Sequence, residues 1–541
     1  MTRTADQSEL VRRMHRDYES GMAYKRSLNL LDTVETNERF YLGDQWHGLK
    51  TRQLRPIVLN VLRRAVTFFQ ATIVSDDIGV ELRPPMASEE QTLFCRAAEQ
   101  EIERVIERAD LKARGREVLR DGAVDGDGIL YLWFDPDEES GQAVSGEIRA
   151  ETLMNTNVIL GNPYSPDIQR QPWIMIVRRR AVADVRREAK ALGIDPQSIR
   201  PESNSDFVNE EHAEEGSLCT ELIRFWREEG EDGAKRMRVL RICGETVLQM
   251  LENEQSLYPI AWFTWEPRKN CCHGVSPITE AIPSQIAINQ MWTAINTFTH
   301  RVAFPKIVYN KSKFPQGWDG NPDKAVAVNG DPKDSLVNMI GGAQLPAGVL
   351  NVLNSLIDRT MELMGVSDAA LGNVRPENTS AIVAVQNATA APLYLQRLRF
   401  YSYWEQVVRI LVDLMRCYYG QRAVLMEDKE ADPLTGGERE VQKSVLVDFG
   451  ALGQFARDLT VEVGETSYWS RIIQIATADN LLRAGFYTDN VDYLEAIPDG
   501  LIRNKADLIQ KMRERGQTAN MQQQAAPQGG AADINLAAAI G

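Results

Sequence analysis

Cysteine and histidine are the residues of this sequence best suited to holding a metal ion or to nucleophilic chemistry. The run Cys271-Cys272-His273 places three of them together. Adjacent cysteines seldom chelate one ion, and no second pair of ligands follows nearby, so the run does not match a zinc site. No C-x-x-C pair occurs, and we expect buried free thiols kept in a reducing compartment. The six cysteines are Cys95, Cys219, Cys243, Cys271, Cys272 and Cys417.

The histidines do not suggest a catalytic set either. They are scattered along the chain, and no Ser/His/Asp or Cys/His arrangement can be proposed from them. No G-x-S-x-G nucleophile elbow and no G-x-x-x-x-G-K-[ST] phosphate loop occurs. The sequence therefore gives no support to an enzyme or to an ATP-driven motor, and we predict no catalytic residue and no cofactor. The five histidines are His15, His47, His212, His273 and His300.

The acidic, glycine-rich run Asp121–Gly128 mimics a calcium-binding loop in composition. An EF-hand needs oxygen ligands at alternate positions. A loop starting at Asp125 puts Ile129 at the third ligand position, and one starting at Asp121 puts Ala123 at the second. A turn from helix to strand is the better interpretation, and we predict no metal.

The chain has 541 residues, which is enough for three or four domains that could position a functional site. Its 43% hydrophobic and 25% charged residues are typical of a globular protein. The formal net charge of −15 argues against a tight nucleic-acid clamp, because affinity for DNA comes mainly from Lys and Arg neutralising phosphates. The polar N-terminus shows no apolar segment of a secretory signal.

Three long stretches lack any charged residue: Ala281–His300, Ser335–Ile357 and Asn378–Gln396. Each is interrupted by amide, glycine or proline residues, and a bilayer span needs ~20 predominantly apolar residues. We therefore predict no membrane span and no membrane partner. Such stretches in the middle of an otherwise charged chain still require an explanation.

The first half of the sequence predicts an α+β arrangement. Apolar residues at helical spacing favour three helices, and β-rich runs favour a strand followed by a meander. The helices are predicted at Ser8–Tyr41, from Pro56 onward and at Glu89–Arg120, and the strands at Ile129–Phe134, Trp173–Val177, Leu222–Arg227, Arg236–Ile242 and Glu245–Met250.

A long central helix is predicted at Ser276–Arg301. One face is apolar, and the opposite face is polar but carries no charge. A solvated helix face normally carries Lys and Glu. This face suits packing against neighbouring protein or lining a passage where charge would be harmful, and a core helix in a large monomer is the alternative. The polar face consists of Asn289, Gln290, Thr293, Asn296, Thr297 and His300.

The second half of the sequence continues with helices around two irregular segments. A lysine-containing excursion at Phe304–Gly342 precedes a helix at Ala347–Met364. An irregular loop, Gly365–Ser380, leads to a third helix that extends to Tyr419, in which Pro392 predicts a kink. We further predict a β-rich insertion at Ala423–Val463, helices at Tyr468–Arg515 and a disordered tail at Gln517–Gly541.

This order of elements resembles the portal protein of tailed bacteriophages, in its podovirus-type branch. The resemblance covers roughly residues 35 to 510. The motifs that carry it are Phe40–Trp46 followed by Arg55-Pro56 and Asn60, then Gly122–Gly128, Gly161-Asn162-Pro163 with Gln171-Pro172-Trp173, Met364-Gly365-Val366 through Leu371-Gly372, and Thr379–Ile382 with Gln386.

The resemblance implies an α+β, mainly helical portal fold with a β-rich wing, two stem helices, a small α/β clip, a tunnel loop and a helical crown. The implied division is 1–270 for the wing, 271–303 for the first stem helix, 304–345 for the clip, 346–365 for the second stem helix, 366–380 for the tunnel loop, 381–467 for the wing helix and β-rich insertion, 468–516 for the crown and 517–541 for the disordered tail.

The resemblance also implies a ring, usually a dodecamer, at one capsid vertex of the virion, assembled in the host cytoplasm. A separate ATPase, the terminase, would drive double-stranded DNA through the channel without sequence specificity. The other implied partners are the major capsid and scaffolding proteins and a head-tail adaptor. Two alternatives remain: another oligomeric virion head or connector protein without a translocation role, and an enzyme with an unrecognised site.

Three groups of residues follow from the implied roles. The tunnel loop would line the channel with Asp368, Asn373, Val374, Arg375, Glu377, Asn378 and Thr379. The stem helices would present Asn289, Gln290, Thr293, Asn296, His300, Asn351, Asn354 and Asp358 to the channel or to neighbouring subunits. The clip would dock terminase and adaptor through Lys306, Lys311, Lys313, Trp318 and Lys324.

Overall fold

The computed structural model describes most of the first 465 residues and a few residues after them. The described residues are 2–48, 56–74, 78–83, 89–142, 144–201, 218–229, 235–303, 306–309, 312, 331, 337–340, 347–366, 391–431, 438–454, 460–465, 481–482, 493–494 and 509. The chain divides into two compact units, Met1–Val74 with Val80–Val463, and Ser75–Gly79 with Gly464–Gly541. The predicted tail and nearly all of the predicted crown lie outside the described residues.

Two of the predicted N-terminal helices are each divided in two. The predicted helix at 8–41 is α1 (Thr2–Ser27) followed by α2 (Leu30–Leu42), because Asn29 takes a left-handed conformation at φ 55°. Similarly, α4 (Glu89–Arg108) and α5 (Leu111–Asp125) are separated at Asp110, where φ is 50°. Asn and Asp are the residues other than Gly that visit this region most readily.

The helix predicted from Pro56 begins five residues later. Residues 56–60 form no helix or strand, and α3 spans Val61–Ile73. The Asn60 side chain accepts a hydrogen bond from the Arg63 N–H, which caps a free donor of the first helical turn.

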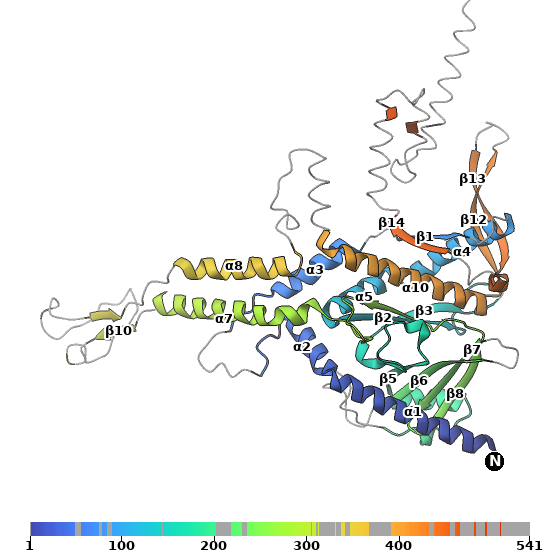
Figure 1. Ribbon diagram of the computed structural model, residues 1–541, viewed down its shortest axis with the longest axis horizontal. Coiled ribbons are helices and arrows are strands. Elements are labelled where there is room, and N and C mark those ends of the chain that lie inside the picture. Colours follow the sequence, from blue (N-terminus) through green and yellow to red (C-terminus); the bar gives the residue numbers. More distant parts are fainter. Residues whose placement is uncertain are drawn as a thin grey trace, which may run out of the picture. The chain divides into compact units, whose positions relative to one another are not determined.

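Two antiparallel sheets lie next to these helices (Figure 1). The three-stranded sheet has the order β3-β2-β9 and consists of β2 (Asp127–Asp135), β3 (Glu147–Leu153) and β9 (Ile260–Thr264). The five-stranded sheet has the order β4-β5-β6-β7-β8 and contains the predicted meander, which is confirmed. Its strands are β4 (Val158–Leu160), β5 (Trp173–Ala181), β6 (Leu218–Glu229), β7 (Lys235–Cys243) and β8 (Thr246–Asn253).

The five-stranded sheet separates two hydrophobic clusters because alternate side chains of a strand point to opposite faces. In β5, Ile174 and Ile176 belong to the cluster shared with β2 and β9, whereas Met175 and Val177 pack in the cluster that contains residues of α1. A third cluster lies under the short helix α6 (Val182–Ala191). Short 3-10 turns connect these elements at Asn155–Asn157, Ile168–Arg170 and Pro196–Ser198.

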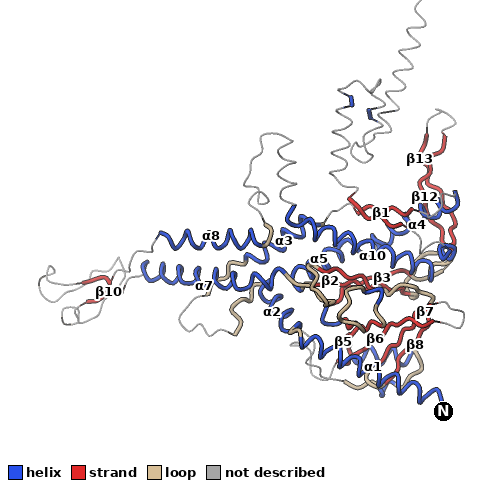
Figure 2. Tube along the Cα trace, viewed as in Figure 1, coloured by secondary structure: helices blue, strands red, loops and turns tan. Residues whose placement is uncertain are grey.

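The central helices are confirmed close to their predicted bounds. α7 spans Pro277–Ala303 and α8 spans Ala347–Leu363, and the two lie side by side (Figures 1 and 2). Between them along the chain, β10 (Lys306–Tyr309) pairs antiparallel with β11 (Val337–Ile340). We call α7 and α8 the helical hairpin.

The third helix, α10 (Tyr394–Tyr418), packs on β9. Pro392 does not kink it: this proline lies in a 3-10 turn, Ala391–Leu393, immediately before the helix. Proline has no N–H to donate within a helix, and it is tolerated at such an entry. Residues 367–390, with the rest of the predicted third helix, lie outside the described residues.

The β-rich insertion is confirmed as a hairpin of β12 (Gln421–Ala431) and β13 (Glu438–Asp448), followed by a 3-10 segment, Phe449–Gln454. The last strand, β14 (Thr460–Glu465), forms a two-stranded sheet with β1 (Ile78–Arg83). Helices and strands mix along the chain, so the α+β class is confirmed. None of the helices in the described part of the chain combines the length and the apolar character that crossing a bilayer requires.

Candidate functional site

A row of polar side chains on α7 binds the backbone of the segment 57–61, which leads into α3. The Ile57 N–H donates to Thr293 Oγ1 at 3.1 Å, and the Leu59 N–H donates to Asn289 Oδ1 at 3.1 Å. The Val61 N–H donates to Gln285 Oε1 at 3.0 Å. Three alternate N–H groups of one segment are thus satisfied by one helix.

The spacing of this row follows from helix geometry. Side chains four residues apart lie on the same face of a helix, about 6 Å apart along its axis. Gln285, Asn289 and Thr293 therefore match every second residue of the segment. Gln285 also donates to the Leu59 carbonyl at 2.7 Å. We call these three side chains the α7 polar row.

The α7 polar row corrects part of the prediction for the stem helices. Asn289 and Thr293 were expected to face a channel or a neighbouring subunit, but each is only 2% exposed and is hydrogen-bonded within its own chain. Their uncharged character is explained by this contact, because a charged side chain would be buried there without a counterion. Gln290 and His300 are exposed, and Asn296 is half-buried.

The other predicted site residues fall into two groups. Asn351, Asn354 and Asp358 lie on α8 and are exposed. The predicted tunnel-loop residues lie outside the described residues, as do Lys311, Lys313, Trp318 and Lys324 of the predicted clip. Lys306 begins β10, but its side chain is not among those described.

The calcium-like run and the Cys-Cys-His run meet at one buried carboxylate. Asp127 Oδ1 accepts hydrogen bonds from the Gly274 N–H at 2.9 Å and from Trp262 Nε1 at 3.2 Å. Asp127 Oδ2 lies 2.9 Å from His273 Nδ1. The run at 121–128 is the predicted turn from helix to strand, with Gly126 at φ 93° ending α5.

The thiol next to this carboxylate is not poised for reaction. Burial raises the pKa of Cys272 to about 12, so the thiol stays protonated at neutral pH. Within the described residues, no group of three or more His, Cys, Asp or Glu residues could hold a metal ion. The Asp127 contacts join β2 to the loop that precedes α7, which makes them structural.

Lys25 is a buried lysine whose contacts the sequence did not reveal. Its Nζ donates to the carbonyl oxygens of Asn155, Thr156 and Val158 at 2.9, 2.7 and 2.7 Å. Burial lowers the pKa of Lys25 to about 7, while the three carbonyl dipoles favour the ammonium form. The lysine lines a cavity of about 380 Å³ and fastens α1 to the start of the five-stranded sheet.

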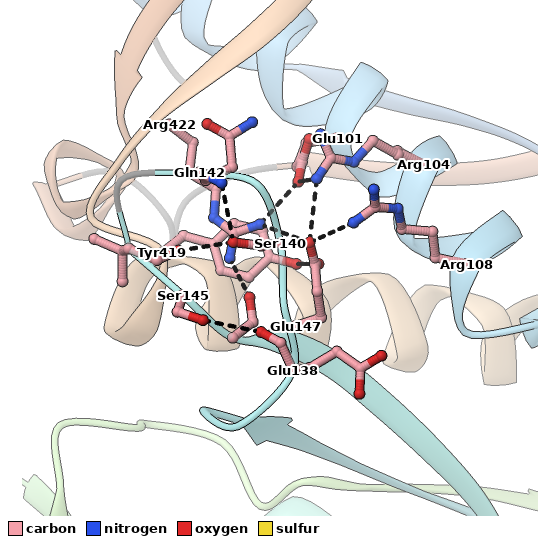
Figure 3. Close-up of polar contacts among 12 residues, drawn as sticks. Glu101, Arg104, Arg108, Glu138, Ser140, Gln142, Ser145, Glu147, Tyr419 and Arg422 are labelled. Carbon is pink, nitrogen blue, oxygen red and sulfur yellow. Dashed lines mark hydrogen bonds and ion pairs between the residues drawn. The ribbon is translucent and has the colours of Figure 1, made fainter.

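A second buried cluster of charges surrounds Arg422 at the start of β12 (Figure 3). The Arg422 guanidinium is fully buried and lies 3.5 Å from the Tyr419 ring centroid. Its Nη1 lies 3.3 Å from a carboxylate oxygen of Glu147 and 3.5 Å from one of Glu101. Burial raises the pKa of Glu101, and this is opposed by the nearby arginines.

This Arg422 cluster fixes the base of the β12–β13 hairpin. Arg104 and Arg108 of α4 also pair with Glu147, at 3.2 and 2.6 Å. Gln142 adds two hydrogen bonds to the backbone of Ala423, at 3.0 and 3.1 Å. The partners come from α4, β3 and β12, far apart in the sequence, so no local signal could have identified them.

In the part of the chain that the structure describes, buried charged side chains join elements of the fold that are far apart in the sequence. A family model described as Phage P22-like portal protein matches residues 208–540. The chain therefore belongs to the P22-like portal protein family, and the resemblance found in the sequence is confirmed. A search among curated proteins found no match.

Family membership sets the general role of the chain. P22-like portal proteins are structural, non-enzymatic components of the phage virion that act as DNA-packaging connectors at the capsid vertex. The family also implies a ring oligomer that interacts with capsid and terminase. The matched residues include the helical hairpin, α10 and the β12–β13 hairpin.

Proposed function

We propose that twelve copies of this chain form a ring at one capsid vertex, and that double-stranded DNA is packaged and later ejected through its channel. The observation that carries this proposal is the family match over residues 208–540, which spans the segments expected to build the channel. In this proposal the domain division given above applies, from the wing at 1–270 to the tail at 517–541.

Charge supports passage of DNA without adhesion. A lysine-rich wall would bind phosphates and make DNA movement slow and dependent on salt. The chain carries a net charge of −15, and α7 has no charged residue from Ala281 to His300. Repeated around a ring, the negative charge gives a field that favours transit over binding.

The channel wall in this proposal comes from the exposed polar residues of the helical hairpin and from the tunnel loop. Gln290, Asn296 and His300 of α7 remain candidates, together with Asn351, Asn354 and Asp358 of α8. The tunnel loop would contact the duplex directly. The clip would dock the terminase large subunit during packaging and the head-tail adaptor afterwards, while capsid and scaffolding proteins would bind elsewhere on the ring.

Electron microscopy of the purified full-length protein tests this proposal. We expect rings with a central hole wide enough for duplex DNA to pass. A complete packaging reaction with capsid shells, terminase and ATP should then protect DNA from nuclease only when the rings are present. Monomers, or rings whose hole is too narrow for a duplex, would contradict the proposal.

A further inference from the structure

A cavity of about 380 Å³ lies between α1 and the start of the five-stranded sheet. One wall is a single face of α1, on which Asp17, Ser20, Tyr24 and Lys25 follow one another at helical spacing. Asp17 and Lys25 are eight residues apart, so the cavity extends for about 12 Å along the helix axis. Its volume lies at the small end of the range of about 300–1,000 Å³ that is typical of ligand pockets.

The Asp17 end of the cavity suits a positive charge. The Trp173 ring of β5 lines the cavity there, and the Arg224 guanidinium lies 4.8 Å from the centroid of this ring. Asp17 Oδ2 lies 2.7 Å from Arg224 Nη1. One ion pair leaves the carboxylate with further acceptor sites, because its two oxygens offer about four lone-pair directions. A carboxylate beside an aromatic face is an environment that favours ammonium groups.

The Lys25 end suits a neutral hydrogen-bond donor. All three N–H groups of Lys25 Nζ donate to carbonyl oxygens, so none is left for a ligand anion. These acceptors are neutral, so the protonated amine repels a ligand cation at this end. His273 also lines the cavity, and its Nδ1 lies 2.9 Å from Asp127 Oδ2. With Nδ1 as the donor to this carboxylate, Nε2 of the neutral imidazole is an acceptor.

Between the two ends the walls are apolar. Ile159 and Leu160 of β4 are buried and line the cavity. The Tyr24 and Tyr164 rings meet edge to face, with their centroids 5.7 Å apart. The Tyr24 hydroxyl donates to the Pro163 carbonyl at 3.3 Å, which occupies this polar group. The middle of the cavity therefore suits a chain of methylene groups.

We propose that this cavity binds a small linear amino alcohol, with its ammonium group at Asp17 and Trp173 and its hydroxyl group at His273. The polarity of the two ends and the apolar walls between them select this class of ligand. The inference goes beyond the proposed function and does not depend on the ring, because the site lies within one chain and uses no residue of the helical hairpin. A ligand that contacts α1 and the sheet together stabilises the docked position of α1.

Three probes with the same number of methylene groups test the site by isothermal titration calorimetry of the full-length protein at neutral pH. The probe 5-aminopentan-1-ol should bind about tenfold more tightly than 1,5-diaminopentane, whose second ammonium meets Lys25. It should also bind about tenfold more tightly than pentane-1,5-diol, which brings no charge to Asp17. Hydrogen exchange of the α1 amides should slow most with 5-aminopentan-1-ol. Equal affinity for the three probes would contradict the proposal.

Substitutions in the cavity give a second readout. Asp17→Asn should weaken binding of 5-aminopentan-1-ol about tenfold. The control Asp184→Asn changes an exposed aspartate of α6 and should leave the affinity unchanged. Ser20→Leu narrows the cavity, keeps the carboxylate and should abolish binding, and circular dichroism checks that each variant is folded. Unchanged affinity in folded Asp17→Asn or Ser20→Leu, or no binding of 5-aminopentan-1-ol to the parent, would overturn the site and leave the proposed function standing.

Discussion

Buried polar side chains of this protein are satisfied by partners far away in the sequence, and their energetic role follows from that. Lys25 donates to three carbonyl oxygens around β4. Asp127 accepts hydrogen bonds from Trp262 Nε1 and the Gly274 N–H and lies against His273 Nδ1. The cost of leaving such groups unpaired exceeds the net gain of making the bond. These residues therefore hold elements of the fold together.

Replacing Lys25 tests this at the residue scale. Lys25→Met keeps the aliphatic stem but leaves three buried carbonyl groups without a donor, so the free energy of unfolding should fall by about 3 kcal/mol. Urea denaturation of the variant and the parent measures this difference in the free energy of unfolding. The exposed Lys190→Met serves as the control and should change stability by less than about 0.5 kcal/mol. Equal losses in both variants would mean that the three hydrogen bonds do not stabilise α1.

Asp121 makes a pH-dependent contribution to the free energy of unfolding. Burial raises the pKa of this carboxyl group to about 6, against the partial compensation of Arg120. The folded state keeps a proton that the unfolded state loses near pH 4, so this contribution to stability is present below about pH 4 and lost as the pH rises through 6.

Asp121→Asn removes this dependence because an amide does not titrate in this range. The stability of the variant relative to the parent should rise between pH 4.5 and 7.5, as measured by denaturation at each pH. The exposed Glu245→Gln is the control and should show no such trend. A constant difference across the range would be inconsistent with the raised pKa.

At the scale of elements, the helices were well predicted, but their breaks were not. α7 and α8 were predicted to within one or two residues because apolar side chains repeat with the helical period over many turns. The breaks at Asn29 and Asp110 were missed, since neither residue is Gly or Pro and nothing local requires φ to be positive there. Asn289 and Thr293 of the α7 polar row belong to the helix face that the sequence marks as unusual, but the segment that they bind, 230 residues before Asn289, was not predicted.

The α7 polar row gives a prediction with a control on the next residue. Asn289→Leu leaves the Leu59 N–H without its acceptor and should lower the free energy of unfolding by about 1–3 kcal/mol. Gln290→Leu makes the same change on an exposed position and should have little effect. Hydrogen exchange at the Leu59 amide should accelerate only in Asn289→Leu. Acceleration in both variants would show that the row does not hold the segment.

The Arg422 cluster should anchor β12 and β13 as a unit. Arg422→Met removes the buried cation and leaves Glu101 and Glu147 with less compensation, which should cost about 3–5 kcal/mol. Exchange of the β12 and β13 amides should increase together. The exposed Arg64→Met on α3 is the control, and a comparably small effect of both substitutions would argue against the anchor.

At the scale of the whole molecule, the net charge of the chain has two different consequences. The negative net charge argued against a protein that binds nucleic acid tightly. Family membership places the chain at the capsid vertex through which DNA is packaged. The two statements agree if the ring encloses DNA without binding it. Passage of a polyanion requires walls that do not neutralise phosphates.

Lysines at two of the proposed channel-wall positions of α8 test this. Asn351→Lys with Asn354→Lys should slow DNA packaging and make its rate depend more strongly on salt, while rings remain intact by electron microscopy. The control pair, Asn351→Gln with Asn354→Gln, keeps the wall neutral and should package at the parent rate. Normal packaging by the lysine variant would refute a neutral-wall requirement.

The sequence by itself determined the α+β class, the central helices, the hairpin insertion and the portal family, because these depend on local periodicity and on the order of motifs. Only the tertiary structure decided which polar residues of α7 are buried and which carboxylates are paired. Burial and pairing arise between segments hundreds of residues apart. The side chain of Asn289 looks the same in the sequence whether it faces a channel or binds the backbone of Leu59.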